Sequence, residues 1–237
     1  MISAEQKLQI EQYLVSKKLP LDILLEVKDH MILQIEDLMN AENLSFDDGF
    51  SKVETSWKEN FELTKYWVFY GNEKIPKIAK SIMKEKYTLL LLKSFSLAAV
   101  FFGLSILLIL YVDDVESYKL FFIIGHSILL LVPLLLYLSH FKNKVYFSKS
   151  FKYKGQINYT LYQQNLTLLM ICFFGMSQMI FNGGENLYNF FDEEGSYSLI
   201  TLILLSAYRM FLYIFGFFGV FNFFEHKKAL KKLQILN

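Results

Sequence analysis

Four long apolar runs follow one another from Tyr87 onward, and they constrain the fold more than any other feature. A helix of about 20 residues crosses a hydrocarbon core about 30 Å thick. We therefore expect transmembrane helices at about 87–112, 119–140, 160–181 and 198–224. The run from Ile106 to Leu110 is apolar at every position, so it lacks the alternation of a transmembrane β-barrel. Tyrosines near the expected span ends suit an interfacial aromatic belt: Tyr87, Tyr111, Tyr118, Tyr159, Tyr162 and Tyr197.

Composition supports a membrane protein. Hydrophobic residues make up 54% of the chain and charged residues 20%. The 24 basic and 23 acidic residues leave a net charge of +1, so the chain has no overall basic field for nucleic acid. Cys172 is the single cysteine, which disfavours a disulfide scaffold. Membrane lipids are the expected partners, and nucleic acid is not.

Charge is divided between the connecting loops. Lysine and arginine in short loops stay on the cytosolic side. Lysines gather before the first span, after the second and after the fourth: Lys74, Lys77, Lys80, Lys84 and Lys86; Lys142, Lys144, Lys149, Lys152 and Lys154; Lys227, Lys228, Lys231 and Lys232. Acidic residues follow the first and third spans: Asp113, Asp114 and Glu116; Glu185, Asp192, Glu193 and Glu194. We expect both termini in the cytosol and the two acidic loops outside.

The amino-terminal region reads as a polar helical domain. Glu5 and Glu11 interrupt the apolar stretch that a signal peptide requires, so this region is expected to begin in the cytosol. Ser3 with Gln6 has capping-box spacing, and Leu19-Pro20 separates a first helix from a second at about 21–41. That second helix carries one apolar stripe: Leu24, Val27, Met31, Ile35 and Leu38. Ser45 and Asp48 then mark the start of a third helix.

These patterns predict an all-α protein, in which a small cytosolic three-helix domain precedes a four-helix transmembrane bundle. The expected divisions are the domain at 1–70, a basic juxtamembrane linker at 71–86, the spans within 87–224 and a basic tail at 225–237.

A family resemblance is carried by the run from Leu19 to Met31, by Ile35-Glu36, and by the run from Leu44 to Phe50. These residues resemble the HAAS-type helical domain, which precedes membrane segments in bacterial proteins linked to PadR-type transcriptional regulators. That domain is related to the prefix domain of some permeases. The resemblance covers about residues 5–62. It implies a signalling or accessory protein of a bacterial inner membrane, with no catalytic motif.

The polar face of the second helix is the candidate partner-binding surface. Its candidate residues are Glu26, Asp29, His30 and Glu36. The Asp29-His30 pair also raises a metal or acid–base reading. No second His or Cys lies nearby to complete a metal site, so we favour contact with a protein partner.

Arg209 is the most informative single residue, because an arginine in the middle of a span costs about 2.5–3.5 kcal/mol. We expect a candidate intramembrane polar site formed by Arg209, His126 and Gln178, with Tyr208 and Tyr213 as further neighbours. Contact with an acidic residue of another membrane protein, a local water defect and snorkelling remain alternatives.

Two functions follow as hypotheses. The first is a non-enzymatic membrane signalling or accessory protein whose cytosolic domain binds a protein partner. The alternative is a small transporter or a membrane subunit of a transport complex, for which four spans would require a second copy or a larger partner. We expect no enzyme, cofactor or metal, since the sequence holds no nucleotide-binding glycine pattern, no Gly-x-Ser-x-Gly and no His-Glu-x-x-His.

Overall fold

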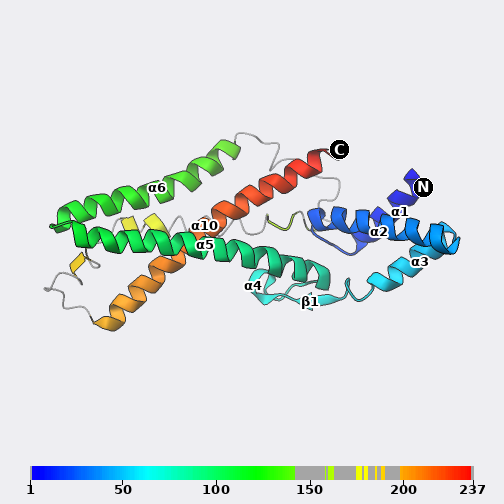
Figure 1. Cartoon of the computed structure of the whole chain (residues 1–237), viewed down its shortest axis with the longest axis horizontal. Helices are drawn as coiled ribbons and strands as arrows, with labels where there is room; N and C mark the ends of the chain where they lie inside the picture. Colours follow the sequence, from blue (N-terminus) through cyan, green and yellow to red (C-terminus); the bar gives the residue numbers. More distant parts are fainter. Residues whose placement is uncertain are drawn as a thin grey trace. The chain divides into compact units, whose positions relative to one another are not determined.

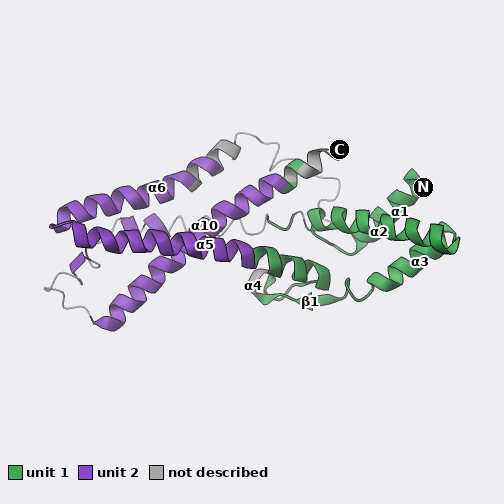
Figure 2. Cartoon of the chain, in the orientation of Figure 1, with its two compact units in different colours: residues 1–87, 150–163, 229–237 green, residues 88–149, 164–228 purple. Residues whose placement is uncertain are grey.

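The computed structural model describes residues 2–141, 158, 160–162, 175–177, 179–180, 185, 188–189 and 198–235. Over these residues the protein consists of helices and one short two-stranded sheet (Figure 1), so the all-α prediction is confirmed for this part of the chain. The chain divides into two compact units (Figure 2). Unit 1 comprises Met1–Tyr87, Ser150–Gln163 and Ala229–Asn237, and unit 2 comprises Thr88–Lys149 and Gln164–Lys228.

Three helices begin unit 1, close to the predicted positions. Helix α1 (Ala4–Ser16) starts with the expected capping box between Ser3 and Gln6. Lys18 then adopts a positive φ of 55°, so the chain leaves the helical conformation. Pro20 occupies the N-cap position of the next helix. Helix α2 (Leu21–Glu42) has Asn43 at its C-cap, with a left-handed backbone conformation. Helix α3 (Phe46–Trp57) has Ser45 at its N-cap, where the serine hydroxyl accepts the Asp48 N–H.

The core of the three helices follows the predicted apolar stripe. Leu24, Val27, Met31 and Ile35 of α2 are buried, together with Ile10 and Leu14 of α1 and Val53 of α3. Gly49 of α3 faces Ile35, where a Cβ would meet the isoleucine at 3.5 Å. An ion pair of 2.6 Å between Glu11 and Lys28 joins α1 to α2. Helical spacing therefore predicts four of the buried residues of α2, whereas the predicted Leu38 is half-buried and Leu21 and Ile23 are buried outside the stripe.

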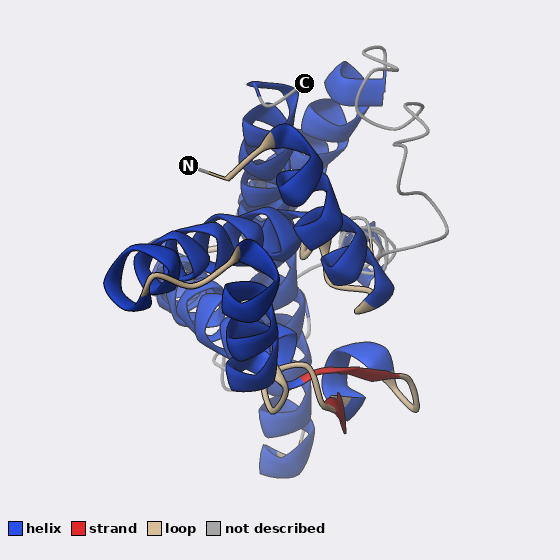
Figure 3. Cartoon of the chain, turned by 90° about the vertical axis from the view of Figure 1, so that its right-hand side faces the viewer, coloured by secondary structure: helices blue, strands red, loops and turns tan. Residues whose placement is uncertain are grey.

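Regular structure continues from the end of the predicted domain, at 63–70, through the predicted linker at 71–86. Strands β1 (Leu63–Lys65) and β2 (Lys74–Pro76) pair antiparallel and flank the short helix α4 (Trp67–Tyr70), as Figure 3 shows with the strands in red. Helix α5 (Lys77–Tyr111) follows β2 directly. Helix α5, which contains the first predicted span, therefore begins ten residues before position 87, and Ala79, Met83 and Tyr87 of this helix are buried within unit 1.

Unit 2 is built around α5, α6 (Val115–Phe141) and α10 (Leu199–Ile235). Its described core contains Ala98 of α5, Tyr118 and Phe122 of α6, and Leu212 and Tyr213 of α10, together with Met176, Met179 and Tyr188. Many large apolar side chains point outward instead, among them Leu92, Leu107, Ile124, Ile128 and Ile203. Such an exposed apolar surface suits contact with lipid hydrocarbon.

Three described helices are long and apolar enough to cross a membrane: Lys77–Tyr111, Val115–Val132 and Leu199–Ala229. They coincide with the first, second and fourth predicted spans. Most of the third predicted span, 160–181, lies outside the described residues. Its first residues, Thr160, Leu161 and Tyr162, are buried and belong to unit 1.

Candidate functional site

Polar side chains lie inside unit 2 while its surface is apolar. His126 of α6 and Arg209 of α10 are 1% and 6% exposed, and Asn222 and His226 of α10 are also buried. Burying polar groups away from water is unfavourable unless they are satisfied, and in lipid they mark functional or structural sites. The contacts of His126 and Arg209 show how differently the two side chains are accommodated.

His126 makes two hydrogen bonds in the interior. Its Nδ1 lies 2.7 Å from the carbonyl oxygen of Phe122, and its Nε2 lies 2.5 Å from the hydroxyl of Tyr213. A carbonyl oxygen can only accept, so Nδ1 carries a proton. A neutral imidazole then accepts the Tyr213 proton at Nε2, which satisfies both ring nitrogens. Phe101 of α5 packs edge-on against both His126 and Tyr213, so this contact joins three helices.

Arg209 lies one helical turn before Tyr213 on α10. The carbon centre of its guanidinium is 5.2 Å from the centroid of the Phe122 ring, a cation–π distance. Its Nη1 is buried and has no hydrogen-bond acceptor among the residues that the structure describes. No Asp or Glu side chain among the described residues forms an ion pair with it. The interior of unit 2 therefore holds a guanidinium cation. Among the described residues, its cation–π contact is with the face of the Phe122 ring.

The structure brings together two of the three residues predicted for this site. Arg209 and His126 both contact Phe122, and Gln178 lies outside the described residues. Tyr213 is a neighbour as expected, whereas Tyr208 is 44% exposed. Tyr118, predicted for the interfacial belt, is instead buried in the core next to Phe122. Phe122 was missed because a phenylalanine in an apolar run carries no sequence signal.

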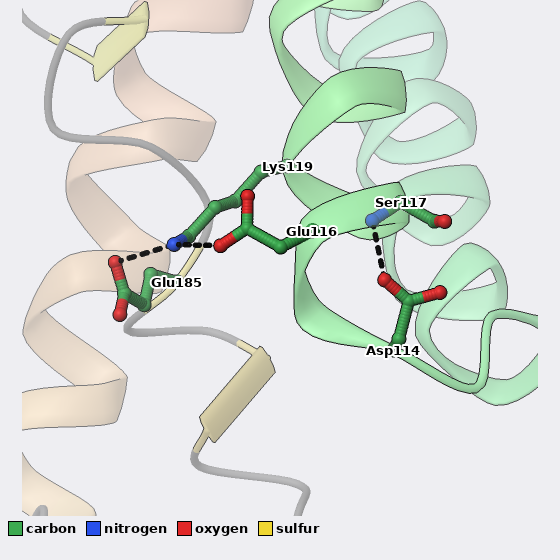
Figure 4. A network of polar contacts seen from close by, with 5 residues as sticks. All are labelled: Asp114, Glu116, Ser117, Lys119 and Glu185. Atoms are coloured by element: carbon green, nitrogen blue, oxygen red, sulfur yellow. Dashed lines mark hydrogen bonds and ion pairs between the residues drawn. The ribbon is translucent and has the colours of Figure 1, made fainter.

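The ends of the expected outer loops meet at Lys119 (Figure 4). Its ammonium lies 3.0 Å from the Glu116 carboxylate and 3.1 Å from that of Glu185. Asp114 accepts the backbone N–H of Ser117 at 2.8 Å and so caps α6. This hydrogen bond lowers the pKa of Asp114. One lysine therefore joins two acidic segments that are far apart in the sequence.

The exposed side of α2 forms an acidic stripe, defined here as Glu26, Asp29, His30, Leu33 and Asp37. All five side chains are exposed, and Leu33 is 57% exposed. Their spacing of three and four residues places them along one side of the helix. No described ion pair involves the stripe, so its charges face solvent.

Glu36, the fourth predicted partner-binding residue, is engaged within unit 1. It is half-buried, and its carboxylate accepts the backbone N–H of Ile2 at 3.0 Å. Glu36 thus holds the segment before α1 against α2. Among the described residues, no group of three His, Cys, Asp or Glu side chains is arranged to hold a metal ion.

A second junction lies within unit 1, where residues from after the second predicted span pack on the amino-terminal helices. We call Asn158, Thr160, Leu161 and Tyr162 the docked segment. The Leu21 N–H donates to the Asn158 carbonyl at 3.0 Å, and the Asn158 amide donates to the Lys18 carbonyl at 3.2 Å. The Leu161 side chain is fully buried, and its carbonyl accepts the hydroxyl of Tyr87. The docked segment therefore packs against the connection between α1 and α2.

Asp22 lies at the centre of this junction. Its carboxylate accepts the backbone N–H of Leu161 at 3.1 Å. Burial raises the pKa of Asp22, although this hydrogen bond and the positive charge of Lys86 act in the opposite direction. Asp22 therefore contacts the docked segment, whereas Glu26, Asp29 and Asp37 of the same helix are exposed.

Comparisons with protein-family models, curated proteins and solved structures found no match to this chain.

Proposed function

We propose that this chain is a non-enzymatic membrane protein that acts in signalling or as an accessory subunit, and that its amino-terminal helices bind a protein partner on the cytosolic side of a bacterial cell membrane. The observation that carries this proposal is the acidic stripe on α2. Three carboxylates and His30 surround the exposed Leu33 without an ion pair to any described residue. The resemblance of residues 5–62 to HAAS-type domains adds support.

The chemistry of the stripe indicates the kind of partner. A central apolar side chain surrounded by charges has the arrangement of a protein-binding patch. Carboxylates in such a patch attract a basic surface and exclude acidic ones. The partner is therefore a protein that presents lysine or arginine around a small apolar recess.

The composition of unit 1 supports the cytosolic placement. Unit 1 gathers three stretches of the chain, 1–87, 150–163 and 229–237. These stretches contain or adjoin the three lysine-rich segments that the positive-inside rule keeps in the cytosol. A single side of the membrane accommodates all of them if the chain crosses an even number of times between them.

Site-specific photocrosslinking of the full chain tests the proposal. A photoreactive residue replaces Leu33, and the native host is irradiated. We expect one discrete crosslinked protein, lost when Asp29→Lys is added and retained with Glu73→Lys. Glu73 is an exposed acid in the turn between α4 and β2, so its reversal makes the same charge change elsewhere. Equal crosslinking in both variants, or none in the parent, would contradict partner binding at the stripe.

A second candidate function is a membrane subunit for transport, favoured by the burial of Arg209 beside Phe122 and near His126. Intramembrane cations commonly mark substrate pathways. Flux through proteoliposomes containing the purified chain distinguishes this candidate. Transport that disappears in Arg209→Leu supports it, and absence of flux with a correctly folded chain rejects it for the chain alone.

A further inference from the structure

Within the described part of the chain, the Nη1 atom of Arg209 lacks an acceptor, and it lies where water does not reach readily. The side chain is 6% exposed, and its described surroundings are aromatic. A guanidinium presents several N–H donors in a planar fork that matches a carboxylate or a phosphate. The aromatic face of Phe122 compensates the charge but accepts no conventional hydrogen bond from Nη1. A carboxylate or phosphate oxygen is the acceptor that best matches this charged donor.

An apolar cavity lies beside this position, between α5 and α6. Its volume is about 120 Å³. Its lining includes Phe101, Leu104 and Leu108 of α5, and Phe121, Phe122 and Gly125 of α6. Phe122 also contacts Arg209, so the cavity and the cation share one wall. Engineered apolar cavities of about 150 Å³ remain dry and bind small hydrocarbons, which shows what a space of this size can hold.

The cavity opens on the apolar surface of unit 2. Leu104 and Phe121 line it and are also more than half exposed. In a membrane this surface contacts hydrocarbon, so an acyl chain reaches the cavity from the bilayer without crossing water. Tyr118 and His126 are the polar groups of the lining besides Ser105. The hydroxyl of Tyr118 lies 3.5 Å from the Ser105 carbonyl, and His126 is satisfied by Phe122 and Tyr213.

We propose that Arg209 and the α5–α6 cavity form a binding site for an anionic amphiphile, whose carboxylate or phosphate pairs with the guanidinium and whose hydrocarbon chain occupies the cavity. The charge of Arg209 selects the acidic head group, and the apolar lining selects the chain. This site lies wholly within unit 2 and does not depend on partner binding by the acidic stripe. The proposed function names no stimulus, and an anionic amphiphile bound at this site would be one.

Equilibrium binding of radiolabelled laurate to the full chain in phosphatidylcholine nanodiscs tests the site, with empty nanodiscs as background. We expect saturable binding of one laurate per chain. Unlabelled dodecyl phosphate distinguishes a phosphate head group from a carboxylate, and its competition at similar concentration shows that either oxyanion is accepted. Dodecanol tests the chain without charge, and acetate tests the charge without a chain. Both should compete at least about tenfold more weakly, the factor expected from losing one charge-assisted hydrogen bond or the apolar contacts.

Variants separate the two halves of the site. Arg209→Gln should weaken laurate binding at least about tenfold. Gly125→Leu should also weaken it, because the new side chain enters the cavity, where a Cβ would meet only Phe101 at 3.8 Å. Gly103→Leu is the matched control, since a Cβ at Gly103 of α5 would meet no atom within 4 Å and Gly103 does not line the cavity. It should bind like the parent.

The outcomes that overturn the proposal are specific. One is the absence of saturable binding by both laurate and dodecyl phosphate. Another is equal binding to the parent, to Arg209→Gln and to Gly125→Leu. If Arg209→Gln does not fold, Gly125→Leu compared with Gly103→Leu still decides the matter, because both changes add the same side chain to a glycine in a helix.

Discussion

The backbone N–H of Leu161 donates to the carboxylate of Asp22 at 3.1 Å, although 139 positions separate the two residues. Asp22 belongs to the first turn of α2, and Leu161 belongs to the docked segment, which follows the second membrane helix in the sequence. Unit 1 is therefore not made from the amino-terminal residues alone. The docked segment is therefore hydrogen-bonded directly to α2, the helix that carries the acidic stripe.

Removing the acceptor at Asp22 should weaken this junction. Asp22→Ala leaves the Leu161 N–H without its partner, and an unsatisfied buried group costs about 1–3 kcal/mol. Asp22→Asn should cost less, because its amide oxygen can accept the same N–H. Tryptophan fluorescence during denaturant unfolding measures the effect, since Trp57 and Trp67 are the two tryptophans and both belong to unit 1. An equal loss in the exposed control Asp29→Ala would argue against the junction.

The stability of unit 1 should depend on the ionisation of Asp22. Burial raises the pKa of this carboxyl above its ordinary value of 3.8 in the folded state. Folded protein therefore binds more protons than unfolded protein between the two pKa values. The contribution is fully present below 3.8 and is lost as the pH rises through the folded pKa. Unfolding free energy measured against pH should fall less steeply over this range in Asp22→Asn, and an identical slope would contradict the assignment.

Leu161→Ala should destabilise unit 1 as a core substitution does. The side chain is fully buried, and replacing such a leucine by alanine costs about 2–5 kcal/mol. Leu63→Ala in strand β1 is the matched control, because Leu63 is 61% exposed. The same fluorescence titration compares the two variants. Similar unfolding midpoints for both would show that the docked segment does not contribute to the core.

Tyr213→Phe tests the polar contact inside unit 2. The change removes the hydroxyl that satisfies Nε2 of His126 and leaves the rest of the ring in place. Hydrogen bonds between membrane helices contribute about 0.6 kcal/mol on average and up to about 1.7 kcal/mol. The thermal midpoint for loss of the monodisperse detergent-solubilised protein should fall in Tyr213→Phe. It should remain at the parent value in Tyr208→Phe, and the reverse order would exclude the contact.

The parts of the fold that the sequence predicts well are those determined by neighbouring residues. Ser3 with Gln6 and Ser45 with Asp48 identify the beginnings of α1 and α3, because capping needs only residues three positions apart. The apolar stripe of α2 likewise predicts four buried side chains, Leu24, Val27, Met31 and Ile35. Apolar length predicts the three described helices that are long enough to cross a membrane.

The parts that were missed depend on contacts between distant residues. Tyr87 and Tyr118 lie near the ends of predicted spans, where interfacial tyrosines are expected. Tyr87 instead donates to the Leu161 carbonyl, and Tyr118 packs among aromatic side chains. An aspartate such as Asp22 is ordinarily a surface residue, but here its carboxylate accepts the backbone N–H of Leu161. Arg209 was identified from its cost in a span, but its contact with Phe122 has no local signature.

Cysteine accessibility in intact cells tests the central claim, which is that unit 1 lies in the cytosol and the acidic loops lie outside. In a Cys172→Ser background, single cysteines replace Asp113, Asp29 and Lys231, all of which are exposed. A membrane-impermeant maleimide should label Asp113→Cys in intact cells, and should label Asp29→Cys and Lys231→Cys only after the inner membrane is permeabilised. Labelling of Asp29→Cys or Lys231→Cys in intact cells, with Asp113→Cys protected, would contradict the account.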